Sequence, residues 1–370
     1  MAENGSSDVT TVPDGPDKVR KSVSVDATPS VDEPETDAEP VVGDEITAED
    51  VEDVNCLELD FNHRRLKTIK NLENLKCIER LYLRWNLLKK IENVSTLTTL
   101  RELELYDNQI TVIENLDCLV NLEVLDLSFN RITHIGGLEN LTNLEKLFLC
   151  DNKIQKIENI NHLKKLQYLE LGDNKLRTIE NLEGLTNLTS LFLGKNKITK
   201  IQNLECLPQL EVFSLQSNRI TKLENLEKLT KLEQLYVSEN GLKEIEGLEN
   251  NTELTTLDLS LNKISQIKNV DHLTKLEEFW MNDNEITDWA CVEKLTANKQ
   301  LVTVYLERNP LSKDGAYRRK VMLTLPWLQQ LDATMCRPQT ESLVLSTSTI
   351  KASCLQSPKR CNAVLSCNVP

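Results

Sequence analysis

Histidine, cysteine and carboxylate side chains are the groups in this chain that could perform acid–base, nucleophilic or metal chemistry. The four histidines, His63, His134, His162 and His272, do not form a cluster. The ten cysteines form no CxxC pair, which favours reduced thiols in an intracellular protein over a zinc site or a disulfide framework. No glycine-rich phosphate loop, HExxH or GxSxG motif is present. We therefore expect no catalytic residues, no bound metal and no cofactor.

Acids and aromatic rings, in contrast, recur at a fixed spacing. They stand four residues before each asparagine of a regular series: Glu58, Tyr82, Glu104, Asp126, Phe148, Glu170, Phe192, Ser214, Tyr236, Asp258, Trp280 and Tyr305. Of the 16 Phe, Tyr and Trp residues in the chain, six occupy this one position. Solvent-facing strand positions accept aromatics for their β propensity alone. A row of rings with interleaved carboxylates nevertheless favours a protein-binding face, because rings anchor interfaces and acids orient a basic partner.

An acid–base pair is the weaker interpretation of the same carboxylates. Asp126 and Glu170 would stand two strands apart, at about 10 Å. Nothing in the sequence indicates a raised pKa for either group. Recognition of a partner is therefore the preferred hypothesis for this row of residues.

The asparagines that set the spacing indicate which elements position the row. They are Asn62, Asn86, Asn108, Asn130, Asn152, Asn174, Asn196, Asn218, Asn240, Asn262, Asn284 and Asn309, at intervals of 24, then nine of 22, then 25 residues. An LxL-like pair precedes each one, as Leu125 and Leu127 precede Asn130, and an apolar residue follows at +2. This pattern resembles that of leucine-rich repeats, at the short end of their length range.

A leucine-rich-repeat solenoid follows from elementary packing. Alternate leucines of a short strand point inward while the residue between them points out. One repeat cannot bury its apolar face, so neighbouring repeats stack, and each asparagine side chain can bond the backbone where the coil turns. We expect an α/β repeat fold of about twelve 22-residue repeats, with a parallel concave sheet and a C-terminal cap. Twenty-two residues leave room only for short 3₁₀ or irregular turns on the convex side.

The composition predicts five regions along the chain. They are a disordered acidic tail at 1–45, an N-terminal capping segment at 46–56, the repeats at 57–309, a C-terminal cap at 310–335 and a disordered Ser/Cys-rich tail at 336–370. Within the N-terminal capping segment we expect a short helix over Thr47–Val54, with Thr47 as its N-cap. A helix over Tyr317–Leu325, closed by Pro326, is the expected centre of the C-terminal cap.

The charge of the chain lies mostly in its first region. The net charge is −15, and residues 1–55 contribute 16 Asp/Glu and 3 Lys/Arg, which is −13. This balance argues against a nucleic-acid partner, because phosphate backbones are bound by Lys and Arg. The sequence has neither an apolar run of membrane-spanning length nor a secretory signal. We therefore expect no membrane partner.

Three sequence blocks carry a more specific resemblance. FLGKNKITK (Phe192–Lys200), EFWMNDNEI (Glu278–Ile286) and VYLERNPLSKDGAYRRKVMLTLP (Val304–Pro326) resemble the leucine-rich-repeat regulatory subunits of the type 1 serine/threonine protein phosphatase, over about residues 45–334. The resemblance implies a non-catalytic protein, monomeric apart from its partner, in the nucleus and cytoplasm. Its concave face would bind the phosphatase catalytic subunit through Asp126, Phe148, Glu170, Phe192, Asp258, Glu278, Trp280 and Tyr305.

Two observations bear on how such a partner would bind. The nearest match to the short R/K-V-x-F docking motif, Lys21–Val25, lacks the final aromatic residue, which fits binding by the folded surface. After about Thr334 the chain departs from the resemblance with an unrelated tail. The resemblance does not say whether the phosphatase is activated or inhibited.

Other readings of the repeat pattern remain open. A scaffold or adaptor of a spliceosomal or ciliary complex would share the fold, although the EFWMNDN block speaks against it. A substrate receptor of a ubiquitin ligase would need a helical module near the N-terminus, for which residues 1–45 are too polar. An enzyme is the least favoured class.

Overall fold

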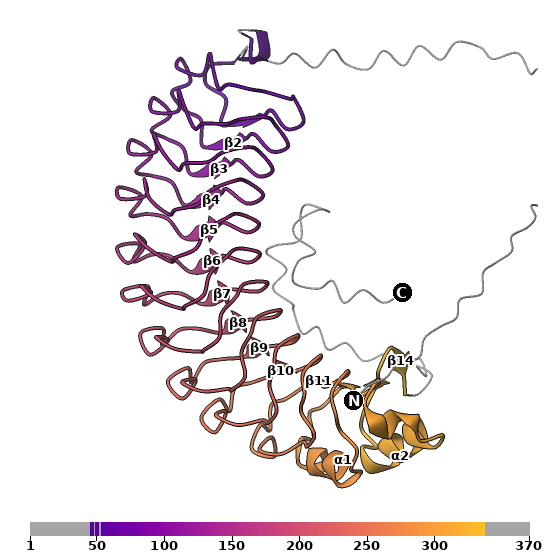
Figure 1. Cartoon of the computed structure of the whole chain (residues 1–370). Helices are drawn as coiled ribbons and strands as arrows, with labels where there is room; N and C mark the ends of the chain where they lie inside the picture. The colour runs from indigo at the N-terminus through magenta and orange to yellow at the C-terminus, as the bar shows by residue number, and fades with distance from the viewer. Residues whose placement is uncertain (1–44, 48, 52, 337–370) are drawn as a thin grey trace, which may run out of the picture. The chain divides into compact units, whose positions relative to one another are not determined.

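Short parallel strands, stacked in chain order, line the inner side of the curved repeat array (Figure 1). The computed structural model describes residues 45–47, 49–51 and 53–336. The sheet has 14 strands in the order β1 to β14, and every neighbouring pair is parallel except β13 and β14. The strands are β1 (Glu58–Asp60), β2 (Arg80–Tyr82), β3 (Glu102–Glu104), β4 (Val124–Asp126), β5 (Lys146–Phe148), β6 (Tyr168–Glu170), β7 (Ser190–Phe192), β8 (Val212–Ser214), β9 (Gln234–Tyr236), β10 (Thr256–Asp258), β11 (Glu278–Trp280), β12 (Thr303–Tyr305), β13 (Gln330–Leu331) and β14 (Thr334–Met335).

The leucines of each strand form one continuous core, as the repeat pattern predicts. Leu125 and Leu127 flank Asp126 and are both 0% exposed. Leu125 lies opposite Leu103 on one side and Leu147 on the other, so each repeat covers the apolar face of its neighbour. The predicted fold class, a leucine-rich-repeat solenoid with a parallel sheet, is confirmed.

The asparagine ladder satisfies the backbone where each coil leaves the sheet. Asn130 Nδ2 donates to the carbonyl oxygens of Leu105, Leu127 and Ser128 at 2.9–3.1 Å, while its Oδ1 accepts from Ile110 N at 2.9 Å. The side chain is 8% exposed. One amide therefore pairs backbone groups of two neighbouring repeats that would otherwise be buried without partners. The predicted role of the ladder is confirmed from Asn86 to Asn309.

The first repeat corrects the predicted register. Asp60, and not Glu58, is the Cα partner of Tyr82, and Glu58 lies opposite Arg80. Residue 64 therefore occupies the ladder position of this repeat, and Asn62 Oδ1 instead accepts from Arg84 N at 2.7 Å. The prediction that Asn62 begins the ladder and Glu58 begins the row of acids and aromatics was wrong. The 24-residue interval arises because Asn62 is displaced by two residues from the 22-residue period.

The convex side consists of tight turns, which agrees with the short repeat. In the third repeat Leu119 N donates to Leu116 O at 2.9 Å, and Leu122 N donates to Leu119 O at 3.0 Å. Between β1 and β11 the described residues contain no helix. The insertion before β12 is helical, with α1 (Ala290–Lys294) followed by the 3₁₀ turn η2 (Leu295–Ala297), which accounts for the final 25-residue interval.

The two ends of the described chain differ in structure. At the N-terminal end, a 3₁₀ turn, η1 (Glu49–Val51), replaces the expected helix, and Thr47 Oγ1 donates to Asp50 Oδ2 at 2.8 Å. At the C-terminal end, η3 (Pro310–Lys313) leads into α2 (Tyr317–Thr324), whose Val321 is 0% exposed. The predicted disordered tails, apart from Glu45 and Cys336, lie outside the described residues.

Residues 45–336, with gaps at 48 and 52, contain no group of three or more His, Cys, Asp or Glu that could hold a metal ion. No helix within these same residues is long and apolar enough to cross a membrane.

Candidate binding groove on the concave sheet

The row of acids and aromatics lies in strict register across the sheet. From β4 to β12 each strand contributes its last residue: Asp126, Phe148, Glu170, Phe192, Ser214, Tyr236, Asp258, Trp280 and Tyr305. We call this set the concave row. Seven of the eight residues named from the sequence belong to it, and Glu278 lies on the same strand as Trp280. Eight strand spacings of about 4.8 Å make the row about 38 Å long.

Several members of the concave row are more buried than a solvent-facing strand position suggests. Asp258 is 2% exposed, Glu170 4% and Phe192 9%, whereas Asp126, Phe148, Trp280 and Tyr305 are half-buried. The inward curvature of the sheet brings side chains of neighbouring strands together, so they cover one another. The residues of the concave row thus share one face but differ in their exposure.

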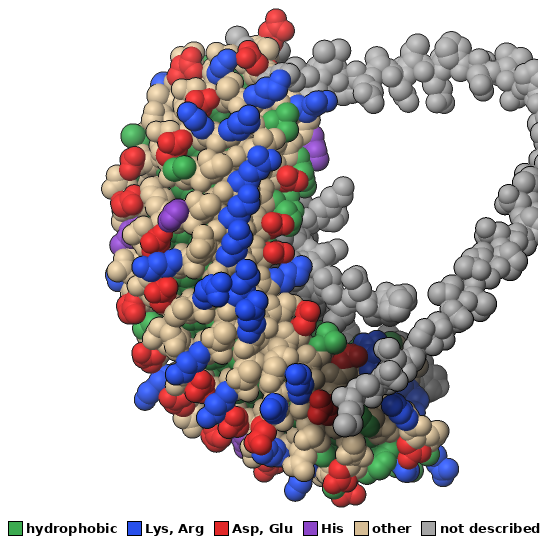
Figure 2. Space-filling view, in the orientation of Figure 1, with side chains coloured by type: hydrophobic (Ala, Val, Ile, Leu, Met, Phe, Trp, Pro, Cys, Tyr) green, Lys and Arg blue, Asp and Glu red, His purple; other side chains and the backbone are tan. Residues whose placement is uncertain are grey.

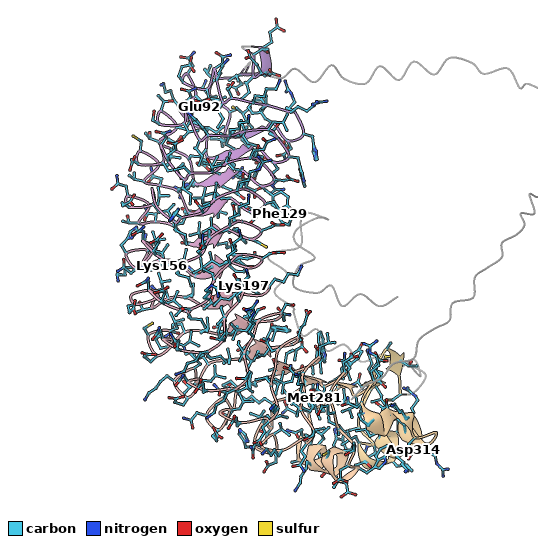
Figure 3. The ribbon with its side chains drawn as sticks, viewed as in Figure 1. Glu92, Phe129, Lys156, Lys197, Met281 and Asp314 are labelled. Atoms are coloured by element: carbon cyan, nitrogen blue, oxygen red, sulfur yellow. The ribbon has the colours of Figure 1, made fainter. Side chains whose placement is uncertain are left out.

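A groove runs beside the concave row, with a hollow of about 430 Å³. Its floor consists of small residues two positions after the row, including Gly172, Gly194, Ser238 and Ser260. Its sides carry Glu170, Phe192, Asp258 and Trp280 from the row, together with Phe129, which Figure 3 labels at the edge of the array. Because the small side chains leave space next to the large ones, the surface can receive a protruding segment of a partner.

The aromatic rings of the concave sheet form two clusters, each with one ring, Phe192 or Trp280, that lines the groove. In the first, the centroid of Tyr168 lies 4.8 Å from that of Phe148 and 5.0 Å from that of Phe192. In the second, the centroid of Trp280 lies 6.5 Å from Tyr236 and 5.9 Å from Tyr305. These separations suit edge and tilted ring contacts, which hold the rings in place before any partner arrives.

Tyr168 belongs to the first ring cluster and was not predicted from the sequence. It occupies the first position of β6, in the same register column as Glu278 of β11, and bridges the two phenylalanines. Its hydroxyl donates to Glu170 Oε2 at 3.4 Å. The signal in the sequence that could have identified it is an aromatic residue two positions before Glu170, as Glu278 stands two positions before Trp280.

A second aromatic series, also missed, follows the edge of the first repeats. His63 stacks on Trp85 with ring centroids 4.3 Å apart, Trp85 contacts Tyr106 at 5.5 Å, and Tyr106 contacts Phe129 at 4.8 Å. Trp85 and Phe129 have φ values of 53° and 56°. This left-handed conformation directs each ring along the edge of the array and not into the core. The series extends the aromatic surface of the groove toward the N-terminal repeats.

The carboxylates of the concave row are held by their neighbours. Asp126 Oδ1 accepts from Ser128 N at 2.9 Å, and Asp258 Oδ1 accepts from Ser260 N at 3.0 Å and from Ser260 Oγ at 2.7 Å. Both aspartates stand in the same LDLS tetrapeptide, so the local sequence sets the orientation of the carboxylate. Burial nevertheless raises the pKa of Asp258 above its ordinary value.

Glu170, which also lines the groove, has a raised pKa as well. Burial, followed by the negative charge of Asp126, raises the pKa of Glu170 to about 7. Burial and the neighbouring Glu277 also raise the pKa of Glu278. Carboxylates that are costly to ionise in the free chain gain most from a cation brought against them. The groove is thus suited to a partner that presents basic groups next to apolar ones.

Comparison with known proteins agrees with this architecture. The family described as "Leucine Rich repeats (2 copies)" matches in seven overlapping segments, 98–140, 120–163, 142–184, 164–206, 186–228, 208–250 and 230–273. Residues 98–273 of the chain therefore consist of leucine-rich repeats.

Three curated relatives share one description. Protein phosphatase 1 regulatory subunit 7 of Xenopus tropicalis is 54% identical over 52 residues, that of Danio rerio 59% over 49, and that of Homo sapiens 55% over 52. The matches cover 14%, 13% and 14% of this chain and 15%, 14% and 14% of the relatives, so the chain is aligned with about one-seventh of the length of the curated relatives.

Solved structures extend the likeness over most of the repeats. An internalin from Listeria monocytogenes is 28% identical with a TM-score of 0.67, covering 77% of this chain and 84% of its own. The octameric complex of latrophilin 3, Unc5D and the repeat protein FLRT2 includes a chain that is 22% identical with a TM-score of 0.62, covering 77% and 92%. The second likeness concerns the fold alone.

Proposed function

We propose that this leucine-rich-repeat protein is a non-catalytic regulatory subunit that binds the catalytic subunit of a type 1 serine/threonine protein phosphatase in its concave groove. The single observation that carries the proposal is the concave row, in which pre-positioned rings alternate with buried carboxylates beside an open hollow. The names of the relatives support the choice of partner. The contact residues proposed are Asp126, Phe148, Glu170, Phe192, Asp258, Glu278, Trp280 and Tyr305.

The dimensions of the groove support a folded partner in preference to a short peptide. The concave row crosses nine strands, about 38 Å. Its two ring clusters lie near Phe192 and near Trp280, so a partner must contact both regions to cover the aromatic surface. Regulation would then follow because the part of the partner's surface that is bound in the groove is no longer accessible to other molecules.

Trp280 is the residue on which we expect binding to depend most. Its ring is half-buried between Tyr236 and Tyr305, and its indole N–H has no acceptor within the described part of the chain. Trp280→Ala should weaken binding of the purified catalytic subunit by at least about thirtyfold, or about 2 kcal/mol, as measured by a calorimetric titration.

Tyr82→Ala is the matched control for this substitution. Tyr82 stands in the same register column on β2, two strands before the concave row begins. We expect its affinity to stay within about twofold of the unchanged chain, as for a residue outside the interface centre. A larger loss for Tyr82→Ala than for Trp280→Ala would move the interface to the N-terminal repeats and contradict the proposal.

Glu278 should contribute mainly through charge. It is half-buried on the same strand as Trp280, so a basic group of the partner that covers the tryptophan comes close to it. Glu278→Ala should weaken binding at low salt and have less effect near 1 M salt, where the screening length falls to about 3 Å. Glu58→Ala is the matched control, since it shares the register column at the opposite end of the sheet and already pairs with Arg80.

Affinity purification of the full chain followed by identification of bound proteins separates this proposal from an adaptor role. Recovery of a phosphatase catalytic subunit that is lost with Trp280→Ala supports it. Recovery of only spliceosomal or ciliary components through the same groove would assign the chain to a different complex.

A further inference from the structure

Five cationic side chains occupy one repeat position outside the groove. The residue after the ladder asparagine is basic in five consecutive repeats, which carry Arg131, Lys153, Lys175, Lys197 and Arg219. All five side chains are exposed or half-exposed, and none is among the described residues that line the groove. Figure 2 shows a line of blue side chains along the middle repeats, where Figure 3 labels Lys197.

The backbone holds these five cations in register. Lys153 N donates to Ile132 O, and Lys175 N donates to Ile154 O, each at 2.8 Å. The residue after each cation points into the core, as Ile154 does at 0% exposure, so the cation before it points outward. The cations therefore stand one repeat apart, at about 4.8 Å, and the five of them span about 19 Å.

The residues around the five cations add positive charge and no acid. The four residues after each ladder asparagine read RITH, KIQK, KLRT, KITK and RITK in these repeats, and we call these five segments the basic stripe. The 20 positions contain nine Lys or Arg and no Asp or Glu, the further cations being Lys156, Arg177, Lys200 and Lys222. Three residue steps of about 3.3 Å make the basic stripe about 10 Å wide.

The charges of the basic stripe are not neutralised within the described part of the chain, where none of the nine side chains forms an ion pair. The repeat geometry itself permits such pairs. Lys268 Nζ, for example, lies 2.7 Å from Glu244 Oε2 of the preceding repeat. Because like charges on neighbouring strands destabilise a sheet, an anionic ligand along the basic stripe would relieve a repulsion that the free protein carries.

The borders of the basic stripe limit the shape of such an anion. Asp151 and Asp173 border it on the side of the groove, which they line, and Glu158 and Glu180 follow the KIQK and KLRT segments on the other side. A nucleic-acid duplex, whose major groove alone is about 12 Å wide, would bring its phosphates over these acids. An extended peptide is narrower, since extended chains pack side by side at about 4.8 Å.

The composition of the basic stripe also favours a peptide over a single-stranded nucleic acid. Proteins that bind single strands combine basic charge with aromatic side chains on which the bases stack. None of the 20 positions is Phe, Tyr or Trp. Carboxylates need only cations and hydrogen-bond donors, and the hydroxyl groups of Thr133, Thr199 and Thr221 stand among the cations.

We propose that the basic stripe binds an extended, Asp- and Glu-rich segment of a partner protein. About six extended residues cover its length of about 19 Å. Exposed ion pairs are individually weak, so the contact is sensitive to salt and strengthens the binding of a partner that this chain also holds at another surface. The contact leaves the concave groove open and does not depend on the phosphatase proposal.

A fluorescently labelled oligoglutamate peptide of about ten residues, which exceeds the length of the basic stripe at about 3.3 Å per residue, is the probe for the full-length chain. Fluorescence anisotropy should show saturable binding at low salt that is lost near 1 M salt, where the screening length falls to about 3 Å. Combining Lys153→Gln, Lys175→Gln and Lys197→Gln should weaken binding at least about tenfold. The thermal midpoint of this triple variant should stay unchanged or rise, because repulsion is removed.

The control is a triple variant of equal charge, Lys165→Gln, Lys228→Gln and Lys231→Gln. These exposed lysines lie on convex turns of the same group of repeats, and their loss should change the affinity for the peptide by no more than about twofold. Absence of saturable binding, or an equal loss in the two triple variants, would overturn the proposal. So would tighter binding of an oligothymidine of the same charge, since the basic stripe would then be a nucleic-acid site.

Discussion

At the scale of single residues, inward-facing and outward-facing positions of neighbouring repeats have different roles. In the repeat around Asn130, Leu127 is 0% exposed in the core, whereas Phe148 of the next strand is half-buried on the concave face. The alternation of the strand decides which residue stabilises the array and which remains available to a partner. Substitutions at the two kinds of position should therefore have separable effects.

Leu127→Ala should lower the free energy of unfolding by about 2–5 kcal/mol, because it leaves a cavity that the neighbouring repeats cannot close. Phe148→Ala should lower it by no more than about 1.5 kcal/mol, mainly through the lost contact with Tyr168. Denaturant titrations of both variants measure the difference. If Phe148→Ala proved the more destabilising of the two, its ring would belong to the core and not to the binding face.

Glu170 should make the stability of the folded chain depend on pH. Its pKa is raised from 4.5 to about 7, so between these values the folded state binds more protons than the unfolded state. Stability attributable to this group is thus lost as pH rises from about 4.5 to about 7, by on the order of 3 kcal/mol. Glu170→Gln should remove that part of the dependence, giving a thermal midpoint above that of the unchanged chain at pH 8 but not at pH 4.5. Parallel pH profiles for the two proteins would contradict the assignment.

At the scale of the elements, the shape of the groove depends on small residues at the turn after each strand. Gly172 lacks a positive φ, and a Cβ there would meet only Gly194 O at 3.6 Å and Cys150 Sγ at 3.7 Å. Gly137, in contrast, has a φ of 66° and its Cβ would press on the backbone of Ile113. The backbone conformation requires glycine at position 137. At position 172 the absence of a side chain leaves the hollow in front of the sheet open.

Substitutions at Gly172 should therefore affect binding without harming the fold. Gly172→Ala should leave the thermal midpoint unchanged or raise stability by about 0.4–1 kcal/mol, and Gly172→Leu should fill the hollow and weaken binding of the phosphatase catalytic subunit at least about tenfold. Gly137→Ala is the control substitution. We expect it to lower the stability of the fold, while the folded molecules bind the phosphatase catalytic subunit with unchanged affinity. Full affinity in Gly172→Leu would show that the partner does not enter the groove.

At the scale of the whole repeat array, each repeat contacts only its neighbours, so the structures at the two ends shield the apolar core of the inner repeats from solvent. The last repeats depend on α2, whose Val321 is 0% exposed, and on Leu328 and Leu331, which are at most 2% exposed. Stability in such arrays is close to a sum of repeat and interface contributions. Damage at one end should consequently spread along the array by degrees.

Val321→Asp should reveal this graded loss of stability along the array, because it places a carboxylate without a partner in the apolar C-terminal cap. Hydrogen exchange followed by mass spectrometry should find protection lost first in β11 and β12, which carry Trp280 and Tyr305, and kept in β4 to β6. The matched exposed substitution Leu323→Asp, at a side chain that is 69% exposed, should leave the exchange pattern unchanged. Equal loss of protection in all strands of Val321→Asp would argue for a single cooperative unit.

The sequence by itself determined the solenoid and the identity of the face that could bind a partner. A 22-residue period with inward leucines and a buried asparagine has one way to satisfy its apolar and backbone groups, which is to stack. The same period places the residue four positions before each asparagine on one face of the sheet. The row from Asp126 to Tyr305 could therefore be identified from the sequence alone. Where the period was interrupted, at Asn62, the alignment failed.

The tertiary structure alone decided how that face is built. Burial of Glu170, Asp258 and Phe192 depends on how sharply the sheet curves, and curvature is a property of many repeats together. The bridge that Tyr168 makes between Phe148 and Phe192, and the hollow above Gly172, arise between side chains 20 or more residues apart. The sequence pattern predicts which residues share a face, whereas the contacts between neighbouring repeats determine which of these residues remain accessible to a partner.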